Sequence, residues 1–73
     1  MTMDPVAEKK TWGTIIQTRR KSRNIQQAEL ADIAGISTRT LREIEKGSGN
    51  PELDTLLRIC SVLGMQIKIE VIT

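Results

Sequence analysis

The chain of 73 residues contains no histidine, no tyrosine, no phenylalanine and a single cysteine. Zinc sites with paired Cys or His ligands, disulfides within the chain, and Ser–His or Cys–His catalytic pairs are therefore excluded. The aromatic share is 1%, which excludes a stacking platform for single-stranded nucleic acid. No apolar run approaches the ~20 residues of a membrane-spanning helix, and no signal peptide is visible. We predict a binding module of the reducing cytoplasm, without cofactor or metal.

What is present fits one small domain, since 38% of the residues are hydrophobic and the formal net charge is only +2. Positive charge is unevenly distributed, because six basic residues and no acidic residue occur between Lys9 and Ala28. The resulting positive field favours an anionic partner. Residues 1–10 are polar and contain Pro5, and we predict a flexible N-terminal arm there.

Apolar residues at helical spacing predict four helices within a domain over residues 11–64. Their expected ranges are about 12–23, 27–34, 38–46 and 52–63. Thr11 and Ser37 are the expected N-caps, and Gly35 ends the second helix. The short Gly-Ile-Ser connection predicts a helix-turn-helix, whose second helix projects from the domain as a ridge. Such a ridge fits the major groove of duplex DNA, which is about 12 Å wide.

Beyond Gly64 the apolar period changes to two, which predicts a single strand over residues 65–73. An unpaired strand exposes a row of backbone donors and acceptors, so we expect it to pair with a second copy in a homodimer. The alternative is an edge strand packed on its own domain. A homodimer would present two recognition helices about 34 Å apart, one turn of DNA. The residues expected in the dimer interface are Met65, Ile67, Ile69 and Val71.

The segment from Ile25 to Gly47 resembles the Xre/Cro-type helix-turn-helix family almost position for position. The motifs Trp12-Gly13-x-x-Ile16 and Asn50-Pro51-x-Leu53-x-x-Leu56-Leu57 resemble that family as well, so the likeness covers about residues 12–64. It implies an all-α, lambda-repressor-like domain that binds a palindromic operator in double-stranded DNA as a transcriptional repressor, associated with the nucleoid. With its terminal strand the chain also looks like the HipB-type antitoxins, which implies a homodimer that represses its own operon and binds a kinase-like toxin.

The same resemblance implies where DNA would be contacted. Gln27 matches the position that contacts the DNA backbone at the start of the first motif helix. On chemical grounds, an arginine can also donate two hydrogen bonds to guanine, worth ~1–3 kcal/mol of discrimination. The alternative for the charged stripe is a solvated helix face. The base-reading side of the next helix would hold Thr38, Arg39, Thr40, Arg42 and Glu43, and the backbone contacts would be Lys46, Ser48, Asn50 and Arg23.

Arg20 and Glu45 fall at inward-facing positions of the first and third helices. Because burial of either charge alone is costly, we predict that the two form an ion pair between these helices. The family resemblance implies an Arg–Glu pair at the same positions. We expect this pair to be structural.

Two functions from different classes remain open at this point. One is the DNA-binding repressor, acting as the antitoxin of a toxin–antitoxin pair. The other is a protein-interaction adaptor whose helix-turn-helix no longer reads DNA, which Glu43 favours because an acidic group repels phosphates. An enzymatic role has no nucleophile–base pair or metal-ligand cluster to support it.

Overall fold

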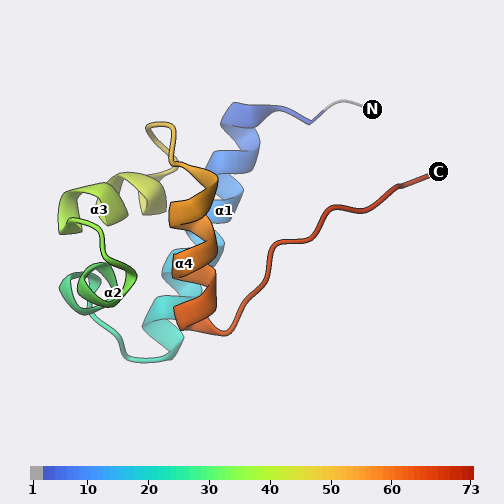
Figure 1. Ribbon diagram of the computed structural model, residues 1–73. Helices are drawn as coiled ribbons and strands as arrows, with labels where there is room; N and C mark the ends of the chain where they lie inside the picture. Colours follow the sequence, from blue (N-terminus) through green and yellow to red (C-terminus); the bar gives the residue numbers. More distant parts are fainter. Residues whose placement is uncertain (1–2) are drawn as a thin grey trace.

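The computed structural model describes residues 3–73, most of which belong to four α-helices (Figure 1). The helices are α1 Pro5–Ser22, α2 Gln27–Ala34, α3 Thr38–Lys46 and α4 Leu53–Leu63. α1 packs against α3 and α4, and α2 packs against the same two helices. The predicted all-α helix-turn-helix domain is confirmed. None of the helices within this range is long and apolar enough to cross a membrane.

The core lies where the four helices meet, and it is built from the apolar positions with helical spacing. Leu30 of α2, Leu41 of α3, and Ile59 and Leu63 of α4 are fully buried. Each such side chain contributes about 1.5–3 kcal/mol by leaving water. The remaining buried apolar members of this cluster are Ile16, Ala31, Ala34 and Ile44.

The turn between α2 and α3 has the capping features predicted from the sequence. Gly35 follows α2 with φ of 74°, a left-handed conformation that a side chain disfavours. Ser37 precedes α3, and its Oγ accepts a hydrogen bond of 3.0 Å from the Thr40 backbone N–H. These two local signals set the length of the turn and hence the angle at which α3 leaves α2.

The start of α1 differs from the prediction, since the helix begins at Pro5 and Thr11 lies inside it. Asp4 is the N-cap, because its Oδ1 accepts a hydrogen bond of 3.0 Å from the Val6 N–H, and proline is favoured in the first turn. Lys9 Nζ also donates to the Gly49 carbonyl at 2.8 Å. The predicted flexible arm is therefore corrected for residues 5–10, while its residues 1 and 2 lie outside the described range.

The prediction of a C-terminal β-strand is wrong for the chain by itself, because residues 65–73 contain no strand. A strand needs a neighbouring extended segment for its ladder, and the segments that surround this tail are helical. Met65 and Ile67 lie half-buried against the helices, whereas Ile69 and Val71 are 97% and 89% exposed. Figure 1 shows the tail leaving the end of α4 and running away from the helices, on the side opposite α3.

Candidate nucleic-acid interface

α3 presents one buried side and one charged, exposed side. Leu41, Ile44 and Glu45 face the interior, and Figure 1 shows α3 at the periphery of the molecule. The Arg39 side chain is 86% exposed. Three further predicted contacts of α3 are also exposed, namely Arg42, Glu43 and Lys46.

The first turn of α3 carries Thr38 and Thr40, which are both half-buried. Thr40 belongs to the helix cap, because its hydroxyl oxygen accepts a hydrogen bond of 2.9 Å from Ser37 Oγ. The hydroxyl hydrogen of Thr40 is not used in this cap and is left as a donor. Thr38 lies beside the depression that is formed at the start of α2.

This depression is polar, has a volume of about 650 Å³, and opens at the N-terminus of α2. Gln26 is the N-cap and makes no side-chain capping hydrogen bond, so the backbone N–H groups of the first turn of α2 are not capped. These groups and the helix dipole favour an anion at this end. The depression is lined by Arg20, Lys21, Asn24, Ile25, Gln26, Gln27, Ala28 and Thr38.

Lys21 is a residue of this depression that sequence reasoning did not assign to DNA contact. α1 ends at Ser22, and Asn24 turns the chain with φ of 56°. This turn places Arg20 and Lys21 next to the beginning of α2. The signal in the sequence was the position of Lys21 within the basic stretch before Gln27.

Arg20 and Glu45 meet beneath this surface, as a buried ion pair between α1 and α3. Arg20 Nε lies 2.6 Å from Glu45 Oε2, and Arg20 Nη2 lies 3.0 Å from Oε1. Arg20 Nη1 donates to the Ile25 carbonyl at 2.9 Å. The hydrogen bond to Glu45 raises the pKa of Arg20, although burial opposes the charged form. Each of the three guanidinium nitrogens thus donates to an oxygen, which is what makes a buried charge tolerable.

The loop after α3 is held close to the helix. Ser48 donates two hydrogen bonds to the Glu43 carbonyl, at 3.0 Å from its backbone N and at 3.1 Å from its Oγ. The Ser48 hydroxyl hydrogen is thereby engaged within the protein, whereas Asn50 is exposed. Both residues adjoin the C-terminal end of α3.

Arg23 is the predicted contact that the structure does not bring to this surface. It follows α1 as the C-cap residue, and its Nη1 lies 3.8 Å from where a Cβ on Gly64 would be. Arg19 Nε donates at 2.8 Å to the Leu63 carbonyl. Both guanidinium groups therefore lie by the C-terminal end of α4, where a positive charge complements the helix dipole.

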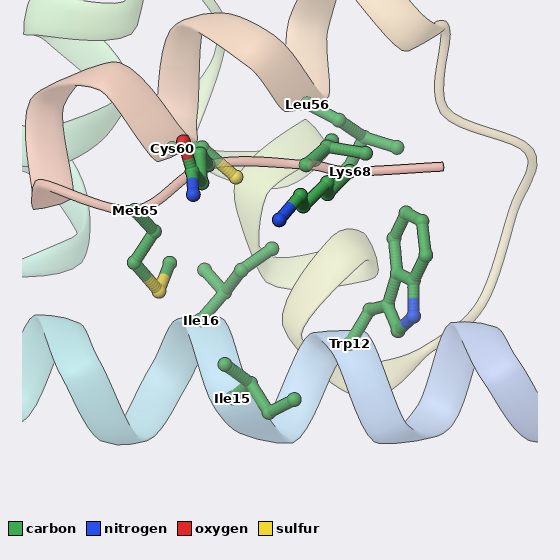
Figure 2. A pocket seen from close by; sticks show the side chains of 9 residues that line it. Trp12, Ile15, Ile16, Leu56, Cys60, Met65 and Lys68 are labelled. Carbon is green, nitrogen blue, oxygen red and sulfur yellow. The ribbon is translucent and has the colours of Figure 1, made fainter. Parts of the chain in front are cut away.

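The predicted dimer residues lie on the other side of the molecule. Met65 and Ile67 line a groove between α1 and α4, together with Trp12, Leu56 and Cys60 (Figure 2). The groove has a volume of about 230 Å³ and a mainly apolar lining. Ile69 and Val71 extend beyond the groove into solvent.

Comparison with known proteins identifies the helical part of the chain. A family profile described as helix-turn-helix, HTH_3, matches residues 16–69. The immunity repressor protein of Bacillus phage phi105 is 39% identical over 57 residues, which are 78% of this chain and 40% of that protein. The HTH-type transcriptional regulator y4mF of Sinorhizobium fredii is 32% identical over 57 residues, 78% of this chain and 75% of that protein.

A solved structure agrees with this match. The crystal structure of an HTH_3 family transcriptional regulator from Vibrio cholerae superposes with a TM-score of 0.78 at 30% sequence identity. The superposition covers 86% of this chain and 35% of the Vibrio protein. The expected Xre/Cro-type helix-turn-helix is confirmed at the level of the family, and the matched relatives are named as regulators and repressors. This chain belongs to the helix-turn-helix family HTH_3.

Proposed function

We propose that the chain is a DNA-binding transcriptional regulator that recognises a specific duplex sequence through α3. The observation that carries this proposal is the exposed basic side of α3, formed by Arg39, Arg42 and Lys46, beside the uncapped start of α2. The repressor of phage phi105 and the regulator of Sinorhizobium fredii support it as relatives.

The two parts of this surface have different tasks in the proposal. A DNA phosphate is bound at the N-terminus of α2, by backbone N–H groups and by Lys21 and Gln27. This contact sets the position of the protein on the duplex but carries no sequence information. Arg39 and Arg42 enter the major groove and donate to guanine, while Thr38 and Thr40 contact neighbouring bases. The backbone beyond α3 is contacted by Lys46 and Asn50.

The test begins with a duplex that the protein selects from a randomised pool. Its affinity is measured by fluorescence anisotropy over a range of KCl concentrations, beside a scrambled duplex of equal length. The logarithm of the binding constant falls linearly with the logarithm of salt, by about 0.9 for each phosphate neutralised. The double variant R39A/R42A loses at least about 2 kcal/mol of discrimination, roughly 30-fold.

The control is Arg23→Ala, which removes one positive charge by the end of α4, away from α3. It retains the discrimination of the wild type. If the wild-type chain shows a salt slope near zero, the protein-interaction adaptor is the correct function. If it binds with a steep slope but R39A/R42A discriminates as well as wild type, α3 is not the reading surface.

We further propose that the regulator acts as a homodimer joined through its α1–α4 side. Ile15, which lines the groove of Figure 2, is 51% exposed, and Leu53 and Leu57 of α4 are 61% and 46% exposed. Exposed apolar side chains near an apolar groove are typical of protein–protein contacts. An interface on this side leaves α3 of each copy free, so that two copies can occupy the two halves of a palindromic site.

The finer proposal is that the regulator represses its own operon as the antitoxin of a toxin–antitoxin pair. It is supported by the exposed apolar tail, where Ile69, Val71 and Ile72 offer a short segment to a second protein. The test is coexpression with the product of the adjacent gene, with copurification and relief of toxicity as readouts. Copurification that persists after residues 69–73 are removed would contradict the role of the tail.

A further inference from the structure

Glu43 is the exposed acidic residue of α3, because Glu45, the other acid of this helix, is buried. Its carboxylate lies within the basic surface, with Oε1 at 3.4 Å from Arg39 Nε. The Glu43 side chain is 48% exposed, whereas that of Arg39 is 86% exposed. The Glu43 carboxylate is therefore more enclosed by the protein than the Arg39 guanidinium is.

The loop after α3 restricts where the Glu43 carboxylate can lie. The Glu43 carbonyl accepts two hydrogen bonds from Ser48, which hold the loop against this turn of the helix. A Cβ at Gly49 would lie 3.6 Å from Glu43 Oε2, so the loop backbone borders the carboxylate on one side. Arg39, one helical turn earlier, is bound on the other side.

The contact with Glu43 uses the Nε atom of Arg39 and leaves the end of the guanidinium free. Nε is directed at Glu43, and the terminal Nη1 and Nη2 groups make no hydrogen bond to the protein within residues 3–73. These two groups lie in one plane and match guanine O6 and N7. An exposed i,i+4 ion pair contributes little to folding stability, so the pair is better explained by what it does to Arg39 than by stability.

The charge of Glu43 has a second effect on DNA binding. Phosphates occur in every duplex, and a carboxylate on the binding surface weakens the attraction to all of them equally. A preoriented Arg39 strengthens binding only where guanine is present. The two effects together lower the affinity for arbitrary DNA and preserve the affinity for the correct site.

We propose that Glu43 is a positioning and specificity-determining residue, which orients the Arg39 guanidinium toward guanine, while its charge weakens binding to every duplex alike. This inference rests on the proposed function, and it differs from the sequence prediction that Glu43 itself contacts a base. A base-reading Glu43 would accept a hydrogen bond from cytosine N4 and would act independently of Arg39. The two roles are distinguished by whether the effect of replacing Glu43 requires Arg39 to be present.

The experiment is a double-mutant cycle on the selected and scrambled duplexes at one fixed KCl concentration. The variants are E43A, E43Q, R39A and R39A/E43A. E43A binds the scrambled duplex more tightly than the wild type does. Its ratio of affinities, selected over scrambled duplex, falls about tenfold, which is part of the roughly 5–150-fold discrimination that one arginine–guanine contact supplies. E43Q gains on both duplexes but keeps most of the ratio, because its amide oxygen still accepts from Arg39 Nε.

In the R39A background, E43A leaves the affinity ratio unchanged within about twofold, because no guanidinium is left to orient. If E43A lowers the affinity ratio equally in the presence and in the absence of Arg39, the positioning role is overturned in favour of direct base contact. An unchanged ratio for E43A in the presence of Arg39 would also overturn it. Both results require that the wild-type chain selects a specific sequence. If no sequence is selected, the proposed function itself fails, and that outcome is distinct from the two above.

Discussion

Gln27 Nε2 donates a hydrogen bond of 3.0 Å to Glu45 Oε1, and so connects the start of α2 to the buried ion pair between α1 and α3. Glu45 Oε1 also accepts from Arg20 Nη2. A glutamine amide has two N–H bonds, one of which is used here, while the other is available to a phosphate. Three helices thus share one polar contact directly beneath the proposed DNA surface.

The first prediction concerns the stability that depends on this contact. In Glu45→Gln the buried Arg20 loses its counter-charge, and the free energy of unfolding falls by about 3–5 kcal/mol. Urea unfolding followed by circular dichroism measures this change. The double variant R20M/E45L removes both charges and recovers most of the loss. A Glu45→Gln variant as stable as the wild type would show that the pair is dispensable.

The second prediction concerns Gln27 as a phosphate contact. Gln27→Ala weakens binding to the selected and the scrambled duplex alike by about 1 kcal/mol, roughly fivefold, because one hydrogen bond is lost. The salt slope stays unchanged, since glutamine carries no charge. A loss confined to the selected duplex would instead mean that Gln27 reads bases.

The third prediction tests the close approach of α1 to α3 at Gly13. A Cβ at this position would lie 2.5 Å from the Ile44 carbonyl oxygen and 2.6 Å from that of Glu45. Gly13→Ala therefore lowers the free energy of unfolding by about 1–3 kcal/mol, although alanine is the better helix former. Thr14→Ala, at the next and exposed position, changes stability by less than about 0.5 kcal/mol. Thermal melts of the two variants provide the comparison.

The fourth prediction is a pH dependence that arises from Cys60. Burial raises the pKa of this thiol above its ordinary value of 9.0. The unfolded chain thus loses the thiol proton at lower pH than the native chain, so this contribution to stability is complete below about pH 9 and is lost at higher pH. Urea unfolding of the wild type between pH 8 and 10.5 shows a steeper decline than that of Cys60→Ala. Parallel declines would contradict the assignment.

The fifth prediction addresses the dimer through the α1–α4 side. Leu57→Lys places a charge in the proposed interface and raises the dimer dissociation constant by about 30-fold, corresponding to about 2 kcal/mol. Ile33→Lys, a matched change at an exposed apolar residue of α2, leaves the dimer intact. Sedimentation equilibrium gives both constants. A wild-type chain that remains monomeric at high micromolar concentration would refute the dimer itself.

The sequence was informative where local chemistry decides the structure. The turn between α2 and α3 depends on Gly35 and Ser37, which act on groups within a few residues of themselves. The same holds for the helical spacing of Leu41 and Ile44, which places the charged side of α3 in solvent. Local signals are also present at Asp4 and Pro5, where the first helix begins, although the composition of residues 1–10 is polar.

The sequence by itself determined the family, the four helices and the charged residues that α3 exposes, because helix periodicity and capping are properties of neighbouring residues. The tertiary structure alone decided that Gln27 bonds to Glu45, that Lys21 borders the start of α2, and that Arg23 lies by the end of α4. It also decided the state of the tail, since an alternating pattern becomes a strand only when another segment supplies its hydrogen bonds.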